Sequence, residues 1–102
     1  MTGTEWSDMR RSRVVVPDYV VGRGFASETV LLNIRTGEYH GLDRVGGRFY
    51  EVIRDAPDLE RASQLLISEY DQPADRIESD LAAFCDDLRN RGLIEIKPAD
   101  EA

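Results

Sequence analysis

The chain of 102 residues has 41% hydrophobic residues, a formal net charge of −7 and a pI near 4.6. This length fits one small domain with a single core. An acidic chain lacks the clustered Lys and Arg that phosphate binding requires, so the composition argues against a nucleic-acid partner. The acidity is concentrated in residues 58–91, where nine carboxylates outnumber four arginines, and a basic ligand would be attracted to this half.

The cysteine content and the hydropathy pattern indicate where the protein works. Cys85 is the only cysteine, so an intramolecular disulfide is impossible and a reducing compartment is expected. The N-terminal residues contain no apolar segment typical of a secretory signal. No apolar run approaches the roughly 18 residues of a transmembrane helix. We therefore expect a cytoplasmic protein without a membrane partner.

The chain begins with a polar segment and a valine-rich one. Residues 1–13 are polar and mixed in charge, and we expect them to form a flexible tail. Residues 14–16 predict an extended lead-in or a short pairing segment, and residues 19–23 predict the first strand after the interruption by a proline. Gly22 and Gly24 would weaken this strand and suggest a bulge or bend.

A β-hairpin is predicted next. Residues 29–34 and 38–42 are rich in β-branched, aliphatic and aromatic residues, which fit a half-buried pleated surface. The polar break between them ends in Gly37, which can supply the positive φ of a hairpin turn. A short connection also makes the first two strands antiparallel neighbours. The sequence thus predicts a three-stranded meander whose last strand, residues 38–42, lies at an edge.

Three helices should follow the meander. Asp43 and Asp58 are candidate N-caps of the first two, because a carboxylate accepts hydrogen bonds from unpaired backbone N–H groups. The third should cover residues 73–91 and end before Gly92, a favourable left-handed C-cap residue. The predicted apolar faces are Val45, Phe49, Val52 and Ile53 in the first helix, Leu59, Ala62, Leu65, Leu66 and Tyr70 in the second, and Ile77, Leu81, Phe84 and Leu88 in the third.

The predicted elements define one α+β domain. A lone three-stranded sheet must pack on helices to be stable, so the helices are expected to cover one of its faces. Leu93 or Ile94 should pack back under the third helix. The domain is expected to span residues 14–96, followed by a C-terminal tail of residues 97–102.

No residue pattern indicates a catalytic or metal site. His40 has no nucleophile or orienting carboxylate beside it in the sequence, which favours a histidine exposed at a sheet edge. Cys85 is expected to act as a small buried apolar residue. One His and one Cys do not supply the about four ligands that zinc needs, and the chain contains no phosphate-binding glycine motif. We therefore expect a protein without catalysis, metal or cofactor.

The strand of residues 38–42 offers a different kind of site. Unpaired backbone groups at a sheet edge can accept an extended peptide, with backbone bonds giving affinity and side-chain pockets giving specificity. Many edge strands are simply protected from such pairing. Strand order alone therefore leaves both interpretations open.

Three segments carry a resemblance to a known family. They are VLLNIRTGEYHGLDRVGGRFYEVI (residues 30–53), LLISEYDQP (residues 65–73) and DLAAFCDDLRNRGLI (residues 80–94). With them the chain resembles the PqqD-like family over residues 19–94. Its members include the RiPP recognition elements, which bind leader peptides of ribosomally synthesised and post-translationally modified peptides. The first segment is the most specific, although Phe49-Tyr50 stands where the family often has a Trp-containing pair.

The resemblance implies a fold and a binding site. The fold is winged-helix-like, with three antiparallel strands followed by three helices. The leader would add as an antiparallel strand to the third strand, in a groove whose other wall is the third helix. The resemblance assigns Glu38, Tyr39, His40 and Gly41 to the backbone ladder, Ile77, Asp80, Leu81 and Phe84 to the groove wall, and Val30 and Leu32 to the pocket floor.

The resemblance also implies partners. A chain this short looks like a stand-alone member that hands a precursor's leader to a separate enzyme. That enzyme would be a leader peptidase in a lasso peptide pathway or a radical enzyme in a quinone-cofactor pathway, and general likeness to discrete lasso-pathway members favours the first. Acidic residues such as Asp80 would meet basic residues of a leader. The identity of the precursor, the recipient enzyme and the oligomeric state stay open.

Two other classes of function remain as alternatives. A winged-helix DNA-binding regulator would share the fold, but residues 73–91 hold five carboxylates and only three arginines, the reverse of a basic recognition helix. A small enzyme or metal protein would need a site completed by a partner.

Overall fold

The computed structural model describes residues 6–25 and 28–99. It confirms an α+β fold in which a three-stranded antiparallel sheet packs on helices. The elements in chain order are α1 (Trp6–Met9), β1 (Ser12–Val15), β2 (Val20–Phe25), β3 (Glu28–Asn33), β4 (Glu38–Leu42), α2 (Arg44–Asp55), α3 (Leu59–Tyr70), α4 (Ala74–Asn90) and β5 (Glu95–Pro98).

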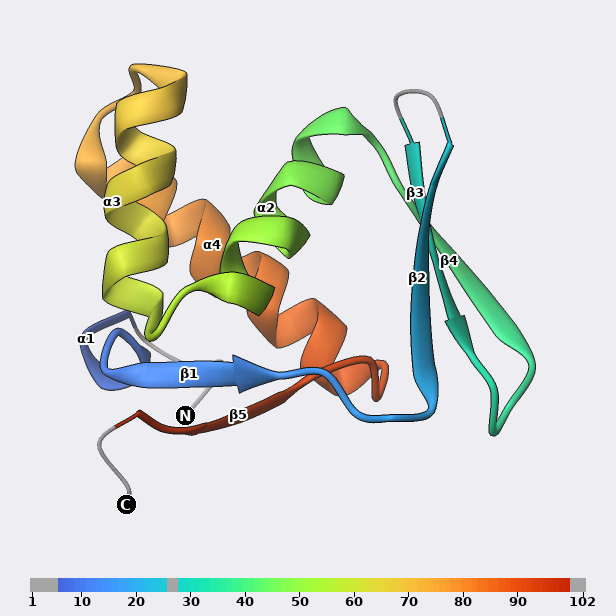
Figure 1. The fold of residues 1–102 in the computed structure, drawn as a ribbon. Coiled ribbons are helices and arrows are strands. Elements are labelled where there is room, and N and C mark those ends of the chain that lie inside the picture. The colour runs from blue at the N-terminus through green and yellow to red at the C-terminus, as the bar shows by residue number, and fades with distance from the viewer. Residues whose placement is uncertain (1–5, 26–27, 100–102) are drawn as a thin grey trace.

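The larger sheet is the predicted meander, with strand order β2-β3-β4. Gly37 adopts φ 77° in the hairpin turn, as expected for a left-handed position. The Asn33 side chain supports the same turn by accepting a hydrogen bond from the Arg35 N–H at 2.9 Å. Figure 1 shows α2, α3 and α4 on one side of this sheet, and none of the described helices covers its other face.

The pairing of β2 with β3 is continuous, so of the bulge or bend expected at Gly22 and Gly24 the bulge is wrong. Gly22 instead leaves room for neighbouring side chains to pack. A Cβ at this position would lie 3.3 Å from Leu31 Cδ2 and 3.4 Å from Tyr50 Cε2, so glycine lets α2 approach the sheet closely.

Both predicted N-caps are confirmed. Asp43 Oδ1 accepts from the Gly46 N–H and Asp58 Oδ1 accepts from the Arg61 N–H, each at 2.8 Å. α4 ends at Asn90, and Gly92 follows with φ 76° in the predicted left-handed conformation. Most residues of the helix stripes are buried, but Tyr70 and Phe84 are only partly buried, and Val45 and Leu65 are both 47% exposed. Helical spacing places a residue on a face but does not tell where the neighbouring element ends.

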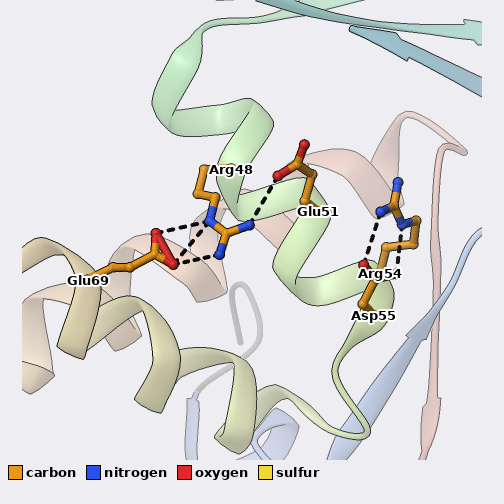
Figure 2. A network of polar contacts seen from close by, with 5 residues as sticks. All are labelled: Arg48, Glu51, Arg54, Asp55 and Glu69. Carbon is orange, nitrogen blue, oxygen red and sulfur yellow. Dashed lines mark hydrogen bonds and ion pairs between the residues drawn. The ribbon is translucent and has the colours of Figure 1, made fainter.

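An ion-pair network joins α2 to α3. Arg48 of α2 donates from Nε to Glu69 Oε1 of α3 at 2.9 Å and from Nη2 to Glu69 Oε2 at 2.6 Å. Its Nη1 donates to Glu51 of its own helix at 3.1 Å. Figure 2 shows the Arg48 guanidinium held between these two carboxylates. The two parallel hydrogen bonds between Arg48 and Glu69 hold α2 and α3 together at a solvent-exposed point of their crossing.

The structure has a second, two-stranded sheet, of which the sequence indicated only a short pairing segment at residues 14–16. β1 pairs antiparallel with β5, from Ser12 opposite Pro98 to Val15 opposite Glu95. Figure 1 shows these two strands lying side by side beneath the helices. Leu93 and Ile94, just before β5, are 0% and 2% exposed, which confirms that this segment packs under α4.

The expected flexible tails are wrong for the residues that the structure describes. Met9 of α1 is 2% exposed and belongs to the core. The Arg10 carbonyl accepts from the Glu60 N–H at 2.8 Å, and the Ala99 N–H donates to the Arg11 carbonyl at 3.0 Å. Pairing between the two ends of the chain thus orders a segment whose local composition is polar. Residues 1–5 and 100–102 lie outside the described residues.

Candidate functional site

The candidate site is the free edge of β4. β4 pairs with β3 on one side, and within residues 6–25 and 28–99 no strand pairs with its other side. In an antiparallel ladder alternate residues direct their N–H and C=O groups to opposite neighbours. Every second residue of β4 therefore presents both groups outward. Tyr39, in the middle of this edge, is 71% exposed.

The register of β3 with β4 decides where the side chains of the edge point. His40 lies opposite Leu31, which is 0% exposed and faces the helices. His40 therefore lies on the helix side of the sheet. Tyr39 lies opposite Leu32, and both side chains project from the helix-free face, since neighbouring residues alternate.

A pocket of about 320 Å³ separates the β4 edge from the C-terminal end of α4. From β4 it is lined by Tyr39, His40, Gly41 and Leu42, and from the other side by Asp87, Leu88 and Arg91. An extended peptide that paired with β4 would pass over this pocket, and its helix-side residues would point into it.

Polar contacts order the wall of the pocket. The Arg91 Nε–H group lies 3.1 Å from each carboxylate oxygen of Asp87, one turn earlier on α4. Arg91 Nη1 lies 3.4 Å from His40 Nδ1 across the pocket. The other ring nitrogen of His40, Nε2, is buried and has no hydrogen-bond partner among the described residues.

The ten residues assigned to peptide binding fall into three groups. Glu38, Tyr39, His40 and Gly41 form the free edge, as expected. Val30 and Leu32 lie on the helix-free face, opposite Gly41 and Tyr39, and so point away from the α4 pocket. The binding role of these residues stays a prediction.

The four α4 residues of that expectation lie away from the pocket. Ile77 and Leu81 are 3% and 0% exposed, so both are core residues. Phe84 packs edge-on against Phe49, with ring centroids 5.6 Å apart. Asp80 is exposed and pairs with Arg76 at 3.4 Å. In this structure the pocket beside β4 is lined from the last turn of α4, and a peptide-binding role of these four residues stays a prediction.

Sequence reasoning missed Asp87 and Arg91 as wall residues. The spacing of Asp87, Leu88 and Arg91 places all three on one helix face, because side chains three and four positions apart are neighbours. Leu88 was already part of the apolar stripe. The apolar stripe of this helix could thus have been extended from Leu88 to its charged neighbours Asp87 and Arg91.

The remaining chemistry is sparse in the part of the chain that the structure describes. No group of three or more His, Cys, Asp or Glu side chains there could hold a metal ion. Burial raises the pKa of the Cys85 thiol to about 12, so this thiol is not a nucleophile near neutral pH. None of the described helices is both long and apolar enough to cross a bilayer.

A larger pocket, of about 590 Å³, lies at the N-terminus of α2. Its lining combines Arg44 and Arg48 with Glu28, Asp43 and Glu51, so no single charge dominates. It does not border the β4 ladder residues 38–41. We therefore place the candidate site at the β4 edge.

An α+β domain with a free strand edge beside a helix belongs to the class of small domains suited to strand addition. Residues 28–94 match the family described as coenzyme PQQ synthesis protein D (PqqD), and the chain belongs to this family. This confirms the resemblance of the three sequence segments. No curated protein matches the chain.

Two solved structures share the fold. The structure of TbiB1 in complex with the TbiA(beta) leader peptide is 34% identical, with a TM-score of 0.71, and the match covers 78% of this chain and 93% of that one. The structure of lasso peptide synthetase B1 complexed with the leader peptide is 25% identical, with a TM-score of 0.72 and coverages of 81% and 98%. Both are complexes with leader peptides.

Proposed function

We propose that this protein binds the leader segment of a precursor peptide as an additional strand on β4. The free β4 edge beside the α4 pocket carries the proposal, because it offers both a backbone ladder and a side-chain pocket. The two similar structures, each solved with a leader peptide, support it. The bound leader would then be presented to a separate processing enzyme.

The other edge of the sheet is a poorer site. β2 is also paired on one side only, but the pocket between sheet and α4 is lined from β4 and not from β2. A guest strand on β2 would gain backbone bonds without that pocket. The proposal therefore assigns the leader to β4.

We infer that the recipient enzyme is the leader peptidase of a lasso peptide pathway and that the protein itself is not a catalyst. Likeness to lasso peptide synthetase B1 favours this pathway over a quinone-cofactor pathway. The DNA-binding alternative finds no support, because α4 carries five carboxylates against two arginines and both similar structures hold peptides.

N-methylation of a labelled leader peptide tests strand addition without changing the protein. We would use the TbiA(beta) leader peptide, methylate one backbone nitrogen at a time, and measure fluorescence anisotropy. Methylation should weaken binding about tenfold at every second position, because only alternate N–H groups bond to β4. Losses without this period of two would contradict strand addition.

Presentation needs a separate assay. The rate of leader removal by a lasso-pathway peptidase would be measured with and without this protein. The proposal predicts a higher kcat/KM for the precursor when the protein is present. An unchanged kcat/KM would leave leader binding intact but overturn the presenting role.

A further inference from the structure

Arg91 reaches from the end of α4 toward the strand that would receive the guest. Its Nη1 atom lies 3.4 Å from His40 Nδ1 of β4, while its Nε–H group faces Asp87 on the helix. The Nε–H group thus faces α4 and the Nη1 atom faces β4, while Asp87 lines the same pocket as Arg91.

The guanidinium has free capacity for a ligand. Arginine carries five N–H donors in a planar fork. Among the described residues its contacts use the Nε–H group and one N–H of Nη1. Three donors at the Nη end therefore stay available, in the geometry that binds a carboxylate through two parallel hydrogen bonds.

Backbone hydrogen bonds close the end of α4. The Leu93 N–H donates to the Leu88 carbonyl at 2.9 Å, and the Gly92 N–H donates to the Arg89 carbonyl at 3.0 Å. Two of the carbonyl groups at this helix end are thus already paired. Of the two charged residues that line the pocket, Arg91 supplies hydrogen-bond donors, and Asp87 supplies a carboxylate that already accepts from the Arg91 Nε–H group.

We propose that Arg91 binds an acidic side chain of the guest strand, an Asp or Glu that points to the helix side. This inference rests on the proposed function and adds the chemistry that sets the guest's register. The rest of α4 is acidic, with Asp75, Glu78 and Asp80 nearer its start. A guest carboxylate is therefore disfavoured near the start of α4 and favoured at Arg91, which would favour one register of the guest.

A random library of linear peptides displayed on phage provides the test, since it assumes no leader sequence. Selections would run in parallel on the wild-type protein, Arg91→Glu and Arg76→Gln. Arg76 is the matched control, because it forms a similar ion pair with Asp80 near the other end of the same helix. Wild type and Arg76→Gln should enrich Asp or Glu at one fixed position. Arg91→Glu should enrich Lys or Arg there instead.

The affinity of the wild-type protein is then measured with one of the selected peptides. Its Glu→Gln analogue should bind wild-type protein about tenfold more weakly, because one charge-assisted contact is lost. This comparison leaves the protein unchanged, so a folding defect of a variant cannot produce the effect.

The outcomes separate this inference from the proposed function. Peptides that show the N-methyl period of two, but have no fixed acidic position or a fixed basic one, would overturn the role of Arg91 and leave strand addition standing. Selected peptides without that period, or no enrichment at all, would overturn both.

Discussion

Gly47 of α2 lies directly against Thr29 of β3. A Cβ atom at Gly47 would lie 2.7 Å from Thr29 Oγ1 and 3.3 Å from Thr29 Cβ, closer than real Cβ contacts. The helix that follows β4 therefore packs on the sheet through a residue without a side chain. This contact sets how closely α2 packs against β3.

Gly47→Ala should destabilise the fold. Alanine favours a helix by up to about 1 kcal/mol over glycine, but overpacking against a stiff β-branched residue costs about 1–3 kcal/mol. We expect a net loss in a urea unfolding experiment. Thr29→Ala should reduce that loss in the double variant, since it removes Oγ1. Gly24→Ala is the control, because a Cβ atom at Gly24 would have nothing within 4 Å.

The Arg48–Glu69 ion pair should make stability depend on pH. Hydrogen bonds from Arg48 lower the pKa of the Glu69 carboxyl below its ordinary value of 4.5. A carboxyl with a lowered folded-state pKa stabilises the fold above its unfolded pKa, and this contribution is lost as pH falls through the folded value. Wild type should therefore exceed Glu69→Gln in stability at pH 7, and the difference should vanish in acid.

The magnitude of that difference should be small. The Arg48 and Glu69 side chains are 38% and 35% exposed, so solvent screens the pair and about 1 kcal/mol is the upper range. Added salt should reduce the difference further. Glu78→Gln removes a carboxylate without an ion pair among the described residues and serves as the control. A difference that persisted in acid would refute the assignment to Glu69.

Cys85 should report unfolding. Its side chain is 0% exposed, and burial raises the pKa of its thiol to about 12. Because the thiolate is the reactive form, iodoacetamide at pH 8 should label the folded protein very slowly. Labelling measured by mass spectrometry should rise with urea along the unfolding transition. Rapid, complete labelling without urea would show that the thiol is accessible.

Variants of Leu81 and Arg91 should separate effects on the stability of the core from effects on peptide binding. Leu81 is 0% exposed, so Leu81→Ala should cost roughly 2–5 kcal/mol of unfolding free energy. Arg91 is exposed, and Arg91→Gln should change stability by less than about 0.5 kcal/mol while weakening binding of an acidic peptide. If Leu81→Ala kept normal stability but bound peptide poorly, Leu81 would be a residue of the groove wall, as the sequence resemblance implies.

Much of the fold was predictable because its signals are local. The turn at Gly37 and the caps at Asp43 and Asp58 depend on residues within a few positions of one another. The pairing of β1 with β5 has no local signal, since the two strands come from opposite ends of the chain. Polar composition therefore suggested tails where the structure has a second sheet.

The site was only partly predictable for a geometric reason. Val30, Leu31 and Leu32 are all apolar, so the period of two could not tell which of them faces the helices. The structure buries Leu31 alone. Helical periodicity likewise gave the apolar face of α4 but not which turn of it meets β4, because that depends on the angle between helix and sheet.

Hydrogen exchange of the β4 amides, followed by NMR with and without a bound leader peptide, tests strand addition most directly. Strand addition predicts that alternate residues of Glu38–Leu42 gain protection when peptide binds, since their N–H groups become bonded to the guest. β2, the other edge strand, is the internal control and should not change. Protection that appears along β2 or on the helices, with none on β4, would contradict strand addition at this edge.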